Sequence, residues 1–79
     1  MASEILNLYQ AKKDGVFQVA TIPNISLLES LGLRIGTRIA LQSRYGLGGP
    51  VLLRVENAFT VAIGKDIAIQ IGVQEVMTS

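Results

Sequence analysis

At 79 residues, the chain is long enough for one domain and for no more. Hydrophobic residues make up 49% of it and charged residues 16%, which is typical of a globular protein whose small interior leaves some apolar side chains at the surface. The net charge is +1 and the seven Lys and Arg residues are spread along the sequence, which excludes the concentrated basic face that nucleic-acid binding requires.

The N-terminal third is predicted to hold the first strand. Residues 4–13 are interpreted as a short turn or edge segment that packs its apolar residues, and Asp14 and Gly15 as a turn. Residues 16–22 are rich in β-branched and aromatic side chains, which favours a strand, and Pro23 ends it.

One helix is predicted, over residues 26–33. Ser26 and Glu29 have the spacing of a capping box, in which each side chain accepts from a free backbone N–H at the helix start. Gly32 can adopt the left-handed conformation that closes a helix. Three leucines, Leu27, Leu28 and Leu31, fall on one face at helical spacing. A helix of about two turns is unstable alone in water, so this face is expected to pack on a sheet.

The remaining strands are predicted at residues 37–43, 51–55, 58–63 and 67–76, where apolar and polar residues alternate. The loop at 44–50 and a turn at 64–66 separate them. The side chains expected to face the core are Ile39, Leu41, Val51, Leu53, Val55, Phe59, Val61, Ile63, Ile69, Ile71 and Val73. Closing such strands into a barrel removes most free edges, so the expected fold class is mostly β, a small five-stranded barrel with one short helix.

The residue types present argue against catalysis. The chain contains no His and no Cys, which excludes Ser-His-Asp and Cys-His mechanisms and zinc sites within one chain. The six acidic residues stand singly, so no pair of carboxylates for acid–base chemistry is indicated. Gly46 to Gly49 and the Gly64-Lys65 pair lack the other residues of nucleotide-binding motifs and are interpreted as turns. We expect no enzyme activity, no cofactor and no metal site built from this chain alone.

The sequence also bears on location. The N-terminus lacks the basic start, apolar core and small-residue cleavage site of a signal peptide. No apolar run reaches the length of about 18 residues that a membrane-spanning helix needs. We therefore expect a cytoplasmic protein that does not span a membrane.

An ordered set of short motifs runs from residue 26 to residue 76. It comprises SLLESLGLRIG, the strand IALQS, the loop GLGGP, the strand pair VLLRV and FTVAI, and the closing segment KDIAIQIGVQEV. In this order the motifs resemble the leucine-rich helix, the P-L-G-x-P loop and the A-x-x-I-x-V closing strand of the ferrous iron transport protein A (FeoA) family. Gly46 stands where the family usually has Pro. Asn24, Ile25 and Ser26 replace basic residues common in the family before its leucines.

The resemblance implies a cytoplasmic SH3-like barrel, a single FeoA-like domain over residues 1–79. It implies that the chain supports FeoB, the membrane GTPase that carries Fe(II) into bacterial cells, by protein–protein contact. Transition-metal binding is implied only at the level of the family.

Three hypotheses about function stay open. The first is an interaction module that binds FeoB, with candidate contacts at Tyr45 and Leu47 in the loop, at the outward Leu52, and at Ser30 and Arg34 beside the helix. The second is an SH3-like regulatory module related to the C-terminal domain of metal-dependent repressors. The third is a self-associating module that forms homo-oligomers through its exposed strand edges.

Overall fold

The structure is a computed structural model, and it describes residues 4–76. In chain order its elements are β1 (Ile5–Asn7), the 3-10 helix η1 (Leu8–Gln10), β2 (Val16–Thr21), α1 (Ser26–Ser30), β3 (Arg38–Arg44), β4 (Val51–Val55), β5 (Phe59–Ile63), α2 (Lys65–Ala68) and β6 (Gly72–Glu75). The predicted fold class, a mostly β SH3-like domain, is confirmed. The described part of the chain has six strands rather than five, and α2 in addition to the predicted helix.

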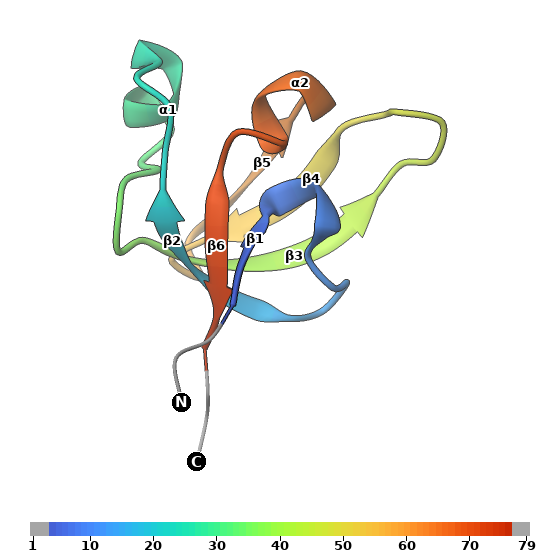
Figure 1. Ribbon diagram of the computed structural model, residues 1–79, viewed down its shortest axis with the longest axis horizontal. Coiled ribbons are helices and arrows are strands. Elements are labelled where there is room, and N and C mark those ends of the chain that lie inside the picture. The colour runs from blue at the N-terminus through green and yellow to red at the C-terminus, as the bar shows by residue number, and fades with distance from the viewer. Residues whose placement is uncertain (1–3, 77–79) are drawn as a thin grey trace.

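The strands form one antiparallel sheet in the order β1-β6-β2-β3-β4-β5. Register shifts between Val19 and Thr21 and between Leu41 and Ser43 mark irregularities that bend β2 and β3. The sheet therefore curls, so that β1, β6 and β2 cross over β3, β4 and β5 (Figure 1).

The curled sheet encloses one hydrophobic core. The buried apolar residues are Leu8, Ala11, Phe17, Val19, Leu28, Leu33, Ile39, Leu41, Val51, Leu53, Val55, Val61, Ile63, Ala68, Ile71 and Val73. The alternation predicted for β3 and β4 is confirmed, because Ile39 and Leu41 and then Val51, Leu53 and Val55 all face inward.

The sixth strand, β1, lies in the segment that was predicted as a turn or an edge. Residues Ile5 to Asn7 pair with β6, and the Leu8 amide continues the contact by donating to the Ile71 carbonyl at 2.8 Å. A three-residue strand is too short to show the alternation on which sequence patterns depend.

The end of α1 agrees with the prediction. Gly32 has a φ of +80° and follows the last helical turn. The Leu33 amide donates to the Leu28 carbonyl at 2.9 Å, and the Gly32 amide donates to the Glu29 carbonyl at 3.0 Å. This is a Schellman motif, and its accompanying hydrophobic contact joins Leu28 to Leu33, both buried.

The predicted capping box at the start of α1 is wrong. Ile25 is the N-cap, Ser26 is the first helical residue, and no side chain caps the helix. Ser26 sits one position too late, so its hydroxyl lies past the first free amides. The helix is held instead by its C-terminal Schellman motif and by the burial of Leu28.

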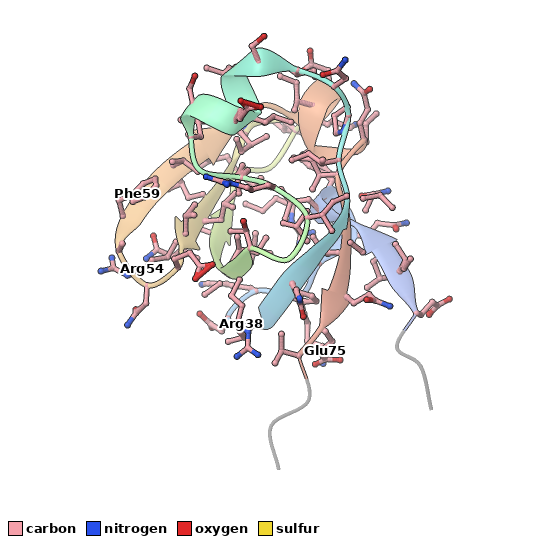
Figure 2. The ribbon with its side chains drawn as sticks, turned by 90° about the vertical axis from the view of Figure 1, so that its left-hand side faces the viewer. Arg38, Arg54, Phe59 and Glu75 are labelled. Carbon is pink, nitrogen blue, oxygen red and sulfur yellow. The ribbon has the colours of Figure 1, made fainter. Side chains whose placement is uncertain are left out.

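Three residues expected in the core are largely exposed, and for these the prediction is wrong. Leu27 is 54% exposed because α1 makes little more than one turn and buries only Leu28. Phe59 is 45% exposed at the start of β5, where Figure 2 shows it at the outer edge of the sheet.

Ile69 is the third of these residues, and it is exposed because its segment is not the strand that was predicted. The segment predicted as a turn and then one strand over 67–76 forms α2 first, and only Gly72–Glu75 is a strand. The Ala68 amide donates to the Gly64 carbonyl at 2.9 Å, which closes the helical turn. Ala68 and Ile71, three residues apart, are buried, while Ile69 is 49% exposed. A short run of alternating isoleucines fits a strand and a helical turn equally well, and packing decides.

Candidate protein interface

The loop of residues 45–50, between β3 and β4, is a tight closed turn. The Tyr45 amide donates to the Pro50 carbonyl at 3.1 Å, and the Gly49 amide donates to the Gly46 carbonyl at 3.2 Å. Leu47 and Gly48 occupy the two central positions, with φ of +60° and +79°. Two positive φ values at the centre are the pattern of a type I′ turn, which favours Asn-Gly.

This turn displays a leucine to solvent. Leu47 is exposed to 109% of its reference area, so its side chain has no packing within the described part of the chain. A β-carbon in the left-handed region costs roughly 1 kcal/mol, which Gly or Asn would largely avoid. Leu47 therefore stabilises the fold neither by a preference for this turn conformation nor by burying apolar area. It offers an apolar side chain on a well-defined loop, which suits contact with another molecule.

The base of the loop rests on Tyr9 of η1. The Tyr9 hydroxyl donates to the Gly49 carbonyl at 3.2 Å. Gly49 also lies close to Tyr45, because a β-carbon at Gly49 would come within 2.8 Å of the Tyr45 β-carbon. These contacts join the loop to a segment that is 40 residues away in the sequence.

Two cations flank the ring of Tyr9. The guanidinium carbon of Arg44 lies 5.8 Å from the ring centroid, and the Lys65 Nζ lies 5.3 Å from it. The Arg44 Nη2 also donates to the Ala11 carbonyl at 2.5 Å. The two distances to the ring centroid, 5.8 Å and 5.3 Å, are in the range of cation–π attraction. We call Arg44 and Lys65 the cation pair. The contact of this pair with Tyr9 has no signal in the sequence, because three elements far apart in the chain build it.

The predicted contact residues divide between two places. Tyr45, which is 55% exposed, and Leu47 share the loop. Leu52 is half-buried on β4, opposite Ser43 and Ala62 and two residues beyond the loop. Ser30 and Arg34 are exposed beside α1. In Figure 1, α1 and the loop lie at opposite ends of the longest axis, so the structure does not bring the five residues into one site.

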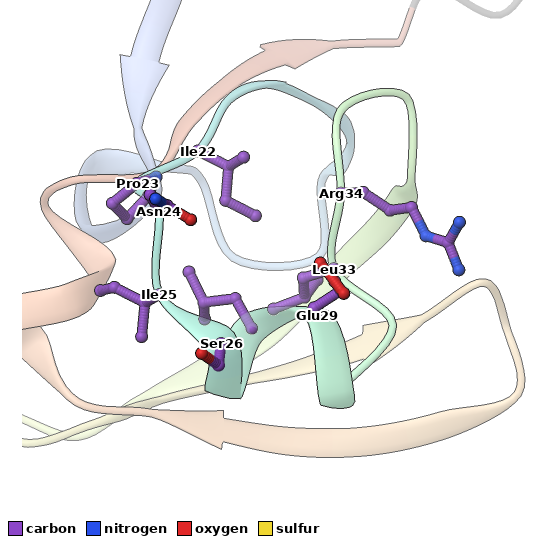
Figure 3. Close-up of a pocket in the computed structure, with 9 residues that line it drawn as sticks. Ile22, Pro23, Asn24, Ile25, Ser26, Glu29, Leu33 and Arg34 are labelled. Atoms are coloured by element: carbon purple, nitrogen blue, oxygen red, sulfur yellow. The ribbon is translucent and has the colours of Figure 1, made fainter.

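A pocket of about 590 Å³ lies at the α1 end. It is lined by Ile22, Pro23, Asn24, Ile25, Ser26, Leu28, Glu29, Leu33 and Arg34, and Figure 3 shows the Arg34 guanidinium pointing away from it. The Arg34 backbone is fixed by the buried Thr37, whose hydroxyl accepts from the Arg34 amide at 3.1 Å and donates to the Gly32 carbonyl at 3.2 Å. Thr37 holds this turn in place, and a single threonine before a strand gave no sequence signal for that role.

Within residues 4–76, no group of three or more Asp or Glu residues is placed to hold a metal ion. No helix in the same range is long and apolar enough to cross a membrane. At the loop, the arrangement can bury one leucine and present two positive charges.

The curled sheet with its protruding loop defines a small SH3-like domain. Within that class, the model of the FeoA domain matches residues 6–75, so the chain belongs to the FeoA domain family. Members of this family are in general non-catalytic accessory proteins, and membership implies a role in ferrous iron uptake. The predicted family resemblance is therefore confirmed.

One solved FeoA structure supports the same assignment, and a second structure shares the fold. A crystal structure of an iron uptake regulatory protein (FeoA) is 26% identical, with 92% of this chain and 99% of that chain covered and a TM-score of 0.82. An NMR structure of a FeoA-like protein from Clostridium acetobutylicum is 20% identical, with 100% and 94% covered and a TM-score of 0.79. A search of curated proteins by sequence gives no match.

The fold also occurs inside a larger kind of protein. A manganese-dependent transcriptional repressor is 20% identical, with a TM-score of 0.84, over 96% of this chain and 44% of the repressor. This likeness concerns the fold alone, and the chain corresponds to less than half of that repressor.

Proposed function

We propose that this protein is a small cytoplasmic, non-enzymatic accessory protein of ferrous iron uptake that acts by contact with FeoB, the membrane GTPase permease. The observation that carries the proposal is the family match over residues 6–75, together with the alignment to the FeoA crystal structure over nearly the whole of both chains. FeoA proteins are accessory to iron uptake, and a domain that lacks His and Cys is better suited to contact than to chemistry.

We place the contact at the 45–50 loop and the neighbouring Leu52. The loop displays Leu47 at full exposure, and Leu52 adds apolar area on the adjoining strand. A few residues that become fully buried at the centre of an interface supply most of its binding free energy. Ser30 and Arg34, at the α1 end, form a separate candidate contact.

The test is a pull-down of the FeoB cytoplasmic domain by the purified protein. Leu47→Asp and Leu52→Asp are expected to abolish capture, because each would place a charge in an apolar contact. Ile5→Asp serves as a control, since Ile5 is 53% exposed on β1 and outside both candidate contacts. Circular dichroism verifies that each variant is folded. Capture of both loop-side variants at the wild-type level would reject the loop as the contact, and Arg34→Glu then tests the α1 end.

A second candidate function is supported by the likeness to the manganese-dependent repressor. A free SH3-like module could regulate a separate DNA-binding protein in the way that a fused domain would. A neighbouring gene for a helix-turn-helix protein would favour this function, whereas a neighbouring gene for a large membrane GTPase favours the first.

Self-association is the third possibility, since β1 and β5 are the two edges of the sheet. Light scattering across a concentration series distinguishes it, because a mass that stays at that of one chain excludes stable homo-oligomers.

A further inference from the structure

We infer that the partner site for the 45–50 loop is an apolar pocket with an acidic rim, entered by Leu47 and held by the cation pair Arg44 and Lys65. This inference rests on the proposed function and names the chemistry of the surface that FeoB would present. It concerns residues outside the sequence prediction, because neither member of the cation pair was among the predicted contacts.

The first argument is the placement of Leu47. Its side chain is fully exposed, and the turn around it is closed by two backbone hydrogen bonds. An interface gains most from an apolar side chain that is fully buried on binding and whose loop needs little further ordering. Leu47 meets both conditions, and its complement is a pocket the size of one leucine.

The second argument is the position of the cation pair. Lys65 approaches the loop itself, because a β-carbon at Gly48 would lie 3.9 Å from the Lys65 Cδ. Arg44 is the last residue of β3, directly before the loop. The same ring of Tyr9, which hydrogen-bonds to the loop at Gly49, lies within 6 Å of both charged groups. Both charged groups therefore lie near the base of the loop that carries Leu47.

The third argument is that these charges remain available. Within residues 4–76, the contacts of Arg44 and Lys65 are an aromatic ring and the Ala11 carbonyl, and neither contact neutralises their charge. Both residues are exposed. A guanidinium has five N–H donors and an ammonium has three, so each can still bind a carboxylate. Complementary charge around an apolar contact fixes its register and speeds association, and here that charge must be negative.

An anionic membrane is the competing occupant, and the observations favour a protein. Stable binding to a membrane surface needs more than one weak signal, such as several inserted apolar residues or a lipid chain with a polybasic patch. The loop offers one leucine and one half-exposed tyrosine beside two cations, and it shows neither a lipid chain nor a polybasic patch. A closed loop that presents one protruding side chain fits a pocket in a protein better than the fluid surface of a membrane.

The experiment measures the affinity of the full chain for purified full-length FeoB in detergent, at salt concentrations from about 50 to about 300 mM. Leu47→Asn deletes the anchor while suiting the turn, and is expected to weaken binding at least about 10-fold, the effect of losing one buried leucine. Lys65→Gln is expected to weaken binding a few-fold at low salt and to reduce the salt dependence.

Matched controls remove the same chemistry elsewhere. Arg38→Gln removes one positive charge at the other end of β3, where Figure 2 shows the side chain at the surface, and Ile5→Asn removes an apolar side chain that is 53% exposed on β1, outside both candidate contacts. Both are expected to bind like wild type.

The outcomes separate the two proposals. Wild-type binding that neither Leu47→Asn nor Lys65→Gln weakens overturns the inference and leaves the proposed function intact. No binding of the wild-type protein to FeoB overturns the proposed function, and this inference with it. Binding to vesicles of anionic phospholipid that depends on Leu47 also overturns the inference, in favour of a membrane.

Discussion

Replacing Leu47 by Asn is expected to make the protein more stable, although it removes an apolar residue. Leu47 has a φ of +60° and its side chain is exposed to 109% of the reference area. Truncation therefore loses no packing, while Asn tolerates the left-handed region and forms the Asn-Gly pair that type I′ turns prefer. The left-handed conformation costs a residue such as Leu about 1 to 2 kcal/mol. Because Asn avoids most of this cost, we expect the free energy of unfolding to rise by about 1 kcal/mol.

Thermal unfolding followed by circular dichroism measures this gain. For a domain of this size, 1 kcal/mol corresponds to a rise in Tm of about 4–8 °C. Urea unfolding provides a second measurement, in which the midpoint should rise while the m-value stays unchanged.

Leu27→Asn is the matched control, because it makes the same exchange at a half-exposed position in the right-handed helix α1. There Asn has a lower helix propensity than Leu, so we expect a small loss of stability, about 0.5 kcal/mol. The reasoning is refuted if Leu47→Asn lowers the Tm, or if the two substitutions shift it in the same direction by the same amount. Either result would mean that the backbone conformation of Leu47 does not determine the change in the free energy of unfolding.

Two further pairs of variants and one single variant test the fold. Leu28→Ala should destabilise the domain by about 2–5 kcal/mol, because it opens a cavity in the core. Leu27→Ala should change the free energy of unfolding by less than about 0.5 kcal/mol. Equal effects in urea unfolding would contradict the assigned face of α1. Gly72→Ala should lower the free energy of unfolding by about 1–3 kcal/mol, because its β-carbon would collide with side chains of β1 and β2. Gly46→Ala has open space around it and should be neutral or stabilising. A neutral Gly72→Ala in the same assay would reject the β1–β6–β2 packing. Tyr9→Phe removes the hydrogen bond to the loop and should cost about 0.5–1.5 kcal/mol; an unchanged midpoint would show that this bond does not hold the loop.

The fold could be predicted from the sequence wherever a segment was long enough to show its period. The alternation in residues 37–43 and 51–55 predicted β3 and β4 with their inward faces, because a strand with one buried face must alternate. Gly32 predicted the end of α1, because few residues other than Gly adopt its φ without cost. Most of the errors occur in the short elements, and the exposure of Phe59 at the start of β5 is the exception. In β1, α1 and α2, three to five residues carry too little pattern, and packing onto the core sets the conformation.

The candidate interface was only partly predictable, for a different reason. Tyr45 and Leu47 stand in a glycine-rich loop, and the sequence indicated that some apolar residues must be left outside a small core. The contact of Tyr9 with Arg44 and Lys65 depends on how η1, β3 and α2 meet in space. No local spacing encodes a meeting of three elements. The division of the predicted residues between the two ends of the molecule has the same origin.

The conflict at Leu47 is itself the strongest sign of function. Sequences generally agree with their structure at every level, and positions that break a local rule without a compensating gain tend to be functional. Glu56, which also has a positive φ of 53°, shows the ordinary case, because its amide donates to the Arg38 carbonyl at 2.8 Å and its carboxylate accepts from the Arg38 amide at 3.2 Å. Leu47 has no such compensation in the described fold. The offset for this leucine is therefore expected from a surface outside the described fold, and a binding measurement tests for it.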